Sequence, residues 1–227
     1  MFLVKVLIIP NIGRATMRVL VACECSGRVR DAFLARGHDA WSCDLKPSEV
    51  PGPHIQDDAL TVLGDGWDLM IAHPECKYLA RSGLHWIGRI PGREAQSREA
   101  LAFVRRLMDA PILRIAIENP PGMIGTNIRP ADQYINPYEF GHDARKPTGL
   151  WLKNLPRLTG TSFTPGRLVG GLYRWANQTD SGQDRTAPGP ERSADRARTY
   201  QGIADAMAEQ WGVLDAYPVQ MSIFERV

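Results

Sequence analysis

The stretch MRVLVACECSGRVRDAFLARGHDAWSCD, residues 17–44, decides the fold. Residues 17–23 are almost continuously apolar and predict a buried strand, which leads into the turn ECSG at 24–27. Apolar side chains recur at helical spacing over 29–36, and residues 40–44 predict a second strand that ends in an aspartate. A strand, a glycine turn, a helix and a strand ending in an acid are typical of the start of a parallel βαβ fold.

Later segments continue this alternation of strands and helices. Residues 68–73 and 112–117 predict two further strands, and 93–110 predicts an amphipathic helix between them. Residues 149–152 predict a short strand, and 203–211 predict a last helix with its small and apolar residues on one face. We therefore predict an α/β fold with a Rossmann-like, parallel-core sheet.

Four residues that are suited to binding or catalysis follow the predicted strands. Gly27, Asp44, Cys76 and Glu118 each lie at or just past a predicted strand end. Ligands bind outside the carboxyl ends of the strands in sheets of this kind. The sequence therefore predicts that these four residues share one rim of the sheet.

The composition is that of an ordinary globular protein. The chain has 227 residues, of which 44% are hydrophobic and 23% charged, which suits one sizeable domain. Its longest apolar run, 2–10, contains Lys5 and is far shorter than the roughly 20 residues that a membrane span needs. We expect a cytoplasmic enzyme or binding domain with no membrane partner.

The net charge of +2 conceals an uneven distribution. Residues 141–200 hold ten Lys and Arg residues against five acids, so this segment carries +5 and the rest of the chain −3. Tyr173 and Trp175 are interleaved with the basic residues. The segment is either a solvated loop or a surface that follows nucleic-acid phosphates.

The four cysteines fall into two groups. There is no CxxC pair, so the spacing of a structural zinc site is missing and we expect no metal centre. Cys23 and Cys43 lie in apolar runs and are expected to be buried, and Cys25 belongs to the glycine turn. Cys76 lies in the polar, proline-containing loop HPECKY at 73–78 and is a candidate nucleophile.

Two motifs that follow predicted strands resemble those of the cytosine-C5 DNA methyltransferases. Pro74-Glu75-Cys76 resembles the Pro-Pro-Cys nucleophile loop of that family, and Glu118-Asn119-Pro120 resembles its Glu-Asn-Val motif. A serine-glycine step, Ser82-Gly83, also follows the cysteine as it does there. Residues 17–211 resemble most closely the compact phage or prophage type, supported by GHDAW at 37–41 and KPTGLWLKNLP at 146–156.

The resemblance implies a sheet of the S-adenosylmethionine-dependent methyltransferase type and a set of catalytic residues. Cys76 would be the nucleophile, and Glu118 the acid that binds ring nitrogen 3 of cytosine, with a pKa raised in a pocket poor in water. Pro74 would stiffen the nucleophile loop, and Asn119 would bind the backbone of that loop. From the residues alone, the alternative is that Glu118 caps the turn that follows it.

The resemblance also implies S-adenosyl-L-methionine as cofactor. The residues that would bind it are the turn after the first strand, an acid for the ribose, an acid for the adenine amino group and the late helix, namely Glu24, Cys25, Ser26, Gly27, Asp44, Asp58, Ala204 and Asp205. The residues themselves leave Asp44 open as a simple turn acid. They leave Asp58 open as the cap of a short helix that begins at Ala59.

The implied substrate is cytosine in DNA, either in a duplex with the base flipped out or in a single strand. Ser82, Arg145, Lys146, Thr148 and Lys153 are the expected substrate contacts. The Gln-x-Arg-x-Arg motif of the family is not visible, and Arg145, Lys146 or Lys153 would have to replace it. Lys146 and Thr148 are equally compatible with ordinary loop positions.

We divide the chain into four parts. Residues 1–16 are an upstream extension with a short strand, since Met17 is a plausible native start, and 17–158 form the catalytic core. Residues 159–198 form a small basic insertion, short for a region that reads a DNA sequence, and 199–227 return to the core as a helix and tail.

The expected reaction is methyl transfer to carbon 5 of cytosine through a covalent Cys76 adduct. Glu75 stands where the family has its second proline, and a carboxylate beside a thiol raises the thiol pKa unless Lys77, His73 or Arg81 offsets it. Two alternatives stay open. One is a related pyrimidine-modifying enzyme that acts on nucleotides or single strands, with a modified sulfonium cofactor. The other is a catalytically inactive relative that binds the cofactor or DNA.

Overall fold

The computed structural model describes residues 16–185 and 198–213. Of the segments predicted from the sequence, residues 1–15 of the extension, 186–197 of the basic insertion and the tail from 214 lie outside the described residues.

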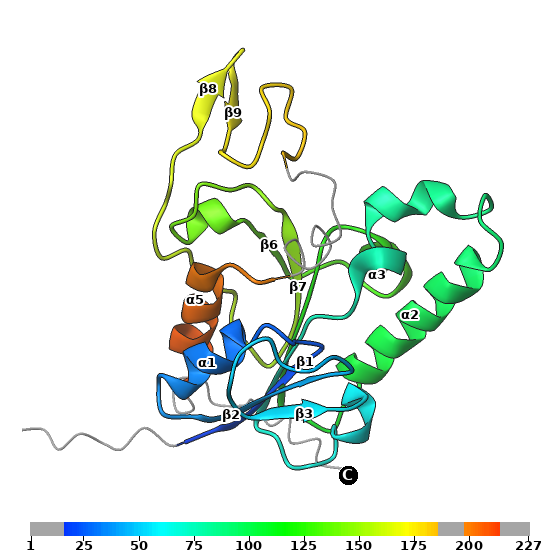
Figure 1. The fold of residues 1–227 in the computed structure, drawn as a ribbon, viewed down its shortest axis with the longest axis vertical. Coiled ribbons are helices and arrows are strands. Elements are labelled where there is room, and N and C mark those ends of the chain that lie inside the picture. The colour runs from blue at the N-terminus through cyan, green and yellow to red at the C-terminus, as the bar shows by residue number, and fades with distance from the viewer. Residues whose placement is uncertain (1–15, 186–197, 214–227) are drawn as a thin grey trace, which may run out of the picture.

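The fold centres on a seven-stranded sheet (Figure 1). Its strands are β1 (Arg18–Ala22), β2 (Asp39–Asp44), β3 (His54–Gln56), β4 (Leu69–Ala72), β5 (Arg114–Asn119), β6 (Gln133–Ile135) and β7 (Thr148–Lys153). They lie in the order β3-β2-β1-β4-β5-β7-β6, with β7 antiparallel to both neighbours and the other pairs parallel. The predicted α/β, Rossmann-like sheet with a parallel core is confirmed.

The chain reverses its direction of winding beside β1. From β1 it proceeds to β2 and β3 on one side, then crosses to β4 and β5 on the other. This is a topological switch point, where the loops after two adjacent parallel strands separate and leave a crevice for a ligand. The loops that follow β1 and β4 therefore flank the expected binding position.

Helices cover both faces of the sheet (Figure 1). On one face, α1 (Arg28–Leu34) and α5 (Gln201–Trp211) share an apolar core with alternate residues of β1, such as Val19 and Val21. On the other face, α2 (Arg93–Met108) and α3 (Met123–Asn127) share a second core with the intervening residues of β1, Leu20 and Ala22. Because β1 is buried on both faces, it appears in the sequence as a continuous apolar run.

A two-stranded hairpin projects from this body, at the top of Figure 1. Its strands, β8 (Arg167–Val169) and β9 (Leu172–Arg174), pair with each other and are separate from the main sheet. Gly170 and Gly171 connect them, both with positive φ (55° and 80°), a requirement of the tight turns that suit hairpins.

Some boundaries differ from the predictions. The strand predicted over 112–117 begins two residues later and extends to Asn119, because Glu118 and Asn119 pair with Leu150 and Gly149 of β7. Strand β3 lies between the predicted strands 40–44 and 68–73, where no strand was predicted. Strand β6 was not predicted, since three residues are too few to show a hydrophobic period.

Short 3₁₀ helices complete the described chain: η1 (Ala59–Thr61), η2 (Cys76–Tyr78), η3 (Arg81–Trp86) and η4 (Pro137–Glu139). Across the described ranges, the helices are all too short or too polar to cross a membrane.

Candidate active site

The loop after β4 presents the candidate nucleophile. Strand β4 ends at Ala72, Pro74 is buried, and Cys76 is exposed at the start of η2. A buried proline fixes the backbone before an exposed thiol, so the thiol is presented from a rigid base. This is the placement predicted for Pro74 and Cys76.

Asn119 ties this loop to the end of β5. Its side chain is 1% exposed, and Nδ2 donates a 2.7 Å hydrogen bond to the carbonyl oxygen of Pro74. The expected contact between Asn119 and the backbone of the nucleophile loop is therefore confirmed. Buried hydrogen bonds of this kind hold two segments in one register, because breaking them leaves both polar groups unsatisfied.

A second set of bonds ties the loop down beyond Cys76. The backbone N–H of Met123 donates to the Leu79 carbonyl at 2.8 Å, and that of Arg81 donates to the Pro121 carbonyl at 2.9 Å. Gly122 lies between them, and a Cβ atom there would overlap the carbonyl oxygen of Leu79. The loops after β4 and β5 are thus joined on both sides of the cysteine.

Glu118 lies next to Asn119 with a different set of partners. His73 Nδ1 is 3.0 Å from Glu118 Oε2, and the side chains are 9% and 14% exposed. Burial raises the pKa of the Glu118 carboxyl, but the hydrogen bond from His73, the charge of Lys146 and a hydrogen bond from Thr148 outweigh it, so the pKa is lowered. The expectation of a raised pKa is therefore wrong for the protein alone.

The expected substrate residues lie in different parts of the structure. Lys146 and Thr148 interact with Glu118 and belong to the rim. Ser82 is exposed in η3, beyond the nucleophile loop, and the backbone of Arg145 is bound by the Asn177 side chain, with its N–H donating to Oδ1 at 2.9 Å.

Lys153 does not belong to the rim. It pairs with Ile115 at the opposite end of the antiparallel β5–β7 ladder, and its Nζ donates to the Ala110 carbonyl at 3.1 Å. The prediction of Lys153 as a substrate contact is therefore wrong, because β7 runs antiparallel to β5 and carries its last residue away from Glu118.

The turn after β1 is organised by Glu24. Its carboxylate is buried and accepts hydrogen bonds from the backbone N–H of Val29 (2.9 Å), from that of Arg30 (3.3 Å) and from the hydroxyl of Ser26 (3.0 Å). Gly27, with φ 72°, precedes α1. Glu24 thus caps the first turn of α1 from inside the protein, where a negative charge also suits the helix dipole.

Arg30 is a structural residue that the sequence did not reveal. Its guanidinium is fully buried and donates to the hydroxyls of Ser42 (3.2 Å) and Ser48 (3.1 Å) and to the carbonyl of Pro51 (3.1 Å). It fixes the loop after β2 beside Gly27, where an added Cβ would collide with it. An arginine in the first turn of a helix gives no signal of such burial, because its partners come from distant positions.

The two acids predicted at the cofactor site have local partners. Asp44 is the last residue of β2, and its Oδ1 accepts from the Lys46 N–H at 2.9 Å. Asp58 Oδ1 accepts from the Leu60 N–H at 3.0 Å and caps η1. The alternative of Asp58 as a cap is confirmed, and contacts of either acid with a cofactor stay predictions.

Helix α5 packs against α1 in the same apolar core. Thr199, just before α5, accepts from Arg28 Nη1 at 2.8 Å, and the Gly202 N–H donates to His142 Nε2 at 2.9 Å. Ala204 is fully buried in the apolar core, so the prediction that it contacts a cofactor is wrong. Asp205 is partly exposed and accepts from Gln201 Nε2 at 2.9 Å.

The other three cysteines are weak nucleophiles at neutral pH. Burial and the charge of Asp44 raise the pKa of both Cys23 and Cys25. Cys43 is fully buried, and burial raises its pKa to about 11. These sulfurs therefore stay thiols at neutral pH, and a thiol is a far weaker nucleophile than a thiolate.

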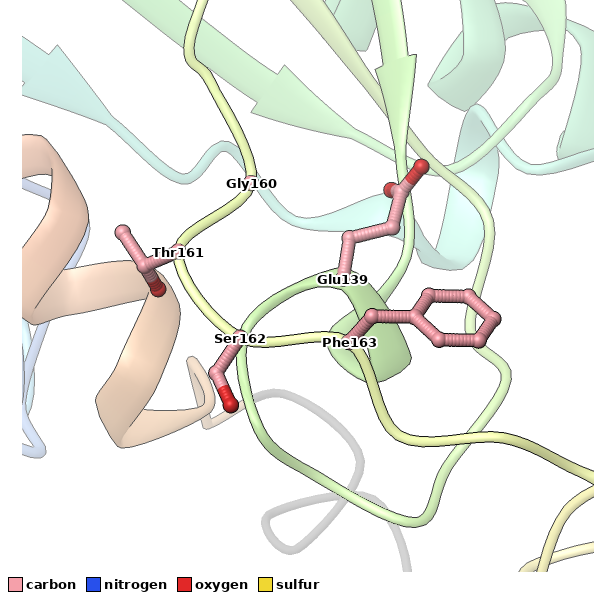
Figure 2. Close-up of a pocket in the computed structure, with 5 residues that line it drawn as sticks. All are labelled: Glu139, Gly160, Thr161, Ser162 and Phe163. Carbon is pink, nitrogen blue, oxygen red and sulfur yellow. The ribbon is translucent and has the colours of Figure 1, made fainter.

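An open pocket of about 300 Å³ lies elsewhere (Figure 2). It is lined by Glu139, Gly160, Thr161, Ser162 and Phe163, none of which is a predicted site residue. Its one carboxylate, that of Glu139, accepts from the Asn136 N–H at 2.6 Å and caps η4. The chemistry therefore points to the rim at β4 and β5.

The comparisons with known proteins concern the fold. No protein-family model matches the sequence, and no curated protein matches it. The solved structures that are similar include two whose descriptions name a methyltransferase. One is described as a candidate DNA modification methyltransferase encoded within an E. coli prophage (TM-score 0.47, 15% identity, 66% of this chain covered). The other is the Entamoeba histolytica methyltransferase EhMeth (TM-score 0.43, 15% identity, 67% covered). The chain spans 53% and 59% of their respective lengths.

Proposed function

We propose that the protein transfers a methyl group from S-adenosylmethionine to carbon 5 of cytosine in DNA, with Cys76 as covalent nucleophile. One observation carries this proposal: an exposed thiol lies on the loop after β4, a buried carboxyl lies at the end of β5, and a hydrogen bond from Asn119 to Pro74 joins the two segments. The order of these residue types along the chain, and their position beside the switch point, support the same conclusion.

The reaction needs a thiolate and an acid group that act on the same cytosine. The Cys76 sulfur adds to carbon 6 of cytosine, forming an S–C bond and making carbon 5 enamine-like. Carbon 5 would then take the methyl group that the bound cofactor supplies. A base removes the carbon 5 proton, and the electron pair released expels the sulfur from carbon 6.

Glu118 would bind ring nitrogen 3 and supply a proton there during the addition. Its pKa is lowered in the protein alone, so the acid form is the minor one before substrate binds. A cytosine that fills the site excludes water and disfavours the charged carboxylate. This raises the pKa of the Glu118 carboxyl. Lys146 and Thr148 hold the carboxylate until then.

The residues at the switch point fit the methyl donor. Gly27 has the positive φ that lets the backbone turn tightly, and Asp44 ends β2 on the same rim with one carboxylate oxygen bound to the Lys46 N–H. The backbone of the turn 24–27 and Asp44 would hold the cofactor, and Glu24 and Ser26 would act through the shape of the turn. The cofactor supplies an electrophilic methyl group, and the protein orients it.

DNA contact would involve the hairpin β8–β9. Its Leu168, Leu172 and Tyr173 are exposed, which is unusual for side chains of this size on one small element. Two of its basic residues already bind the segment that follows the hairpin, since Arg167 pairs with Asp180 and Arg174 donates to the Asp180 carbonyl. We therefore expect its contribution to be mainly apolar, with fewer phosphate contacts than the basic count suggests.

The small hairpin also favours a second candidate. An enzyme that modifies a pyrimidine in a nucleotide or a single strand needs little surface to read a duplex. Among the described residues of the insertion, the only regular elements are the three-residue strands β8 and β9. Such an enzyme would use the same Cys76 and Glu118.

The test is a covalent trap. The protein is incubated with labelled S-adenosylmethionine and DNA that contains 5-fluorocytosine, which cannot lose its carbon 5 substituent as a proton. Wild type should form an adduct that survives denaturation, and Cys76→Ala should form none. Because Cys76 is exposed, Cys76→Ala should unfold at the same temperature as wild type.

Three other outcomes separate the alternatives. Full methylation by Cys76→Ala would exclude the covalent mechanism. Transfer to free nucleotides or single strands but not to duplex DNA would favour the second candidate. Binding of the cofactor without transfer to any substrate would indicate a relative that has lost catalysis.

A further inference from the structure

We infer that His73 is a positioning residue for Glu118: its Nδ1–H holds Oε2 of the carboxyl group in the orientation and ionisation state from which the reaction starts. The inference rests on the proposed function for its catalytic consequence. The contact itself, 3.0 Å between Nδ1 and Oε2, belongs to the protein alone and can be measured separately.

The backbone of His73 is rigidly placed. Its N–H donates to the Ala22 carbonyl at 2.9 Å, which continues the pairing of β4 with β1 by one residue. Its neighbour Pro74 is bound by Asn119, the neighbour of Glu118. Two consecutive residues after β4 therefore contact two consecutive residues at the end of β5, which fixes the backbone segments that carry His73 and Glu118.

The proton on His73 follows from its partners. An ionised carboxylate accepts hydrogen bonds only, so Nδ1 must carry the hydrogen. Nε2 is buried and has no hydrogen-bond partner among residues 16–185 and 198–213. The contact therefore uses Nδ1 as the donor and Oε2 as the acceptor.

The groups that face Glu118 lie at the end of β4 and at the start of β7. His73 follows β4, Lys146 precedes β7, and Thr148 begins β7. Burial opposes the charged form of Glu118, while each of these three groups favours it. Removing the His73 donor removes one stabilising bond of the carboxylate, so the pKa of Glu118 rises.

The pH profile of the reaction reports this ionisation. The proposed mechanism needs the acid form of Glu118 and the thiolate form of Cys76 together, although a carboxyl normally has the lower pKa. In that case the low-pH limb of the profile reports the pKa of the Glu118 carboxyl. The plateau rate increases as the pKa values of Glu118 and Cys76 become closer. Loss of His73 should move the lower limb to higher pH.

Loss of His73 should also lower the rate, for a reason unrelated to ionisation. A carboxyl without its anchor adopts several orientations, and a misplaced catalytic group costs at least about tenfold in rate. The pKa effect alone would raise the plateau. A lower plateau rate, together with a shift of the low-pH limb to higher pH, is therefore specific to a residue that both orients the Glu118 carboxyl and lowers its pKa.

The experiment compares wild type with His73→Leu, which removes the donor, and His73→Asn, which retains an N–H near the place of Nδ1. The pKa of Glu118 is followed by carbon-13 NMR of the labelled carboxyl in the protein alone, assigned with Glu118→Gln. The rate of adduct formation with 5-fluorocytosine DNA is then measured across pH. Thermal unfolding checks each variant, and His73→Ala replaces His73→Leu if the larger side chain prevents folding.

We expect the carboxyl pKa to rise in His73→Leu and to return towards the wild-type value in His73→Asn. We expect the plateau rate to fall at least about tenfold in His73→Leu and to recover in His73→Asn. An unchanged carboxyl pKa in His73→Leu, or a plateau that stays the same or rises, would overturn the inference. If wild type forms no adduct at any pH, the proposed function fails, and the NMR titration still decides whether His73 controls Glu118.

Discussion

At the scale of single residues, two neighbours at the end of β5 divide the roles in the site. Glu118 is the candidate acid, held by His73, Lys146 and Thr148. Asn119 makes no proposed contact with the base and instead binds the Pro74 carbonyl. The motif resemblance pointed to both residues, but the lowered pKa of Glu118 follows from partners up to 45 positions away.

Replacement of Asn119 by Ala tests the holding role. The Pro74 carbonyl would lose its buried donor, so the free energy of unfolding should fall by about 1–3 kcal/mol. Adduct formation should slow at least about tenfold, because the nucleophile loop loses its anchor. Chemical unfolding and the trap measure the two effects. Unchanged trapping in a destabilised protein would show that the bond supports the fold without positioning Cys76.

At the scale of elements, the position of the candidate nucleophile Cys76 depends on the loop after β5. Strand β5 pairs with β7 as far as Asn119, and the chain then turns through Gly122, close to the backbone of Leu79. The sequence predicted both loops and their order. It did not predict their second junction, because a close approach of two backbones leaves no trace in hydrophobic spacing.

Gly122→Ala should therefore displace the segment after Cys76. Its methyl group would overlap the Leu79 carbonyl, so we expect slower trapping and a loss of about 1–3 kcal/mol in stability. The matched control is Gly125→Ala in α3, where the nearest atom to a new Cβ is the Tyr134 hydroxyl at 3.9 Å. That variant should keep its trapping rate and gain up to about 1 kcal/mol, because alanine favours a helix. Equal trapping by both variants would contradict this view of the loop.

At the scale of the whole molecule, the basic C-terminal part is less basic at its surface than its composition indicates. Arg167 is paired with Asp180, and Arg198 is paired with Glu49. The exposed feature of this part is instead the apolar tip of the β8–β9 hairpin, which projects from the body (Figure 1).

Replacing Leu168, Leu172 and Tyr173 together by Ser tests that tip. Their exposed fractions are 66%, 57% and 61%, so stability should change by less than about 0.5 kcal/mol. Affinity for DNA should fall with little change in its dependence on salt, since few phosphate contacts are lost. Leu113→Ser, at an exposed position just before β5 at the opposite end of the sheet, is the control and should bind as wild type does. Unaltered affinity in the triple variant would exclude the hairpin from the DNA surface.

The sequence by itself determined the alternation of strands and helices, the rim that follows the strands, and the order of the cysteine and glutamate loops. These features depend on local periodicity and on the chemistry of short motifs, which neighbouring residues specify. Only the tertiary structure decided that Asp58 caps η1, that Ala204 is buried, that Lys153 leaves the site and that His73 and Lys146 keep the Glu118 pKa low. The reason is physical. Burial, strand direction and charge partners depend on which distant segments of the chain come into contact, and the local sequence does not specify those contacts.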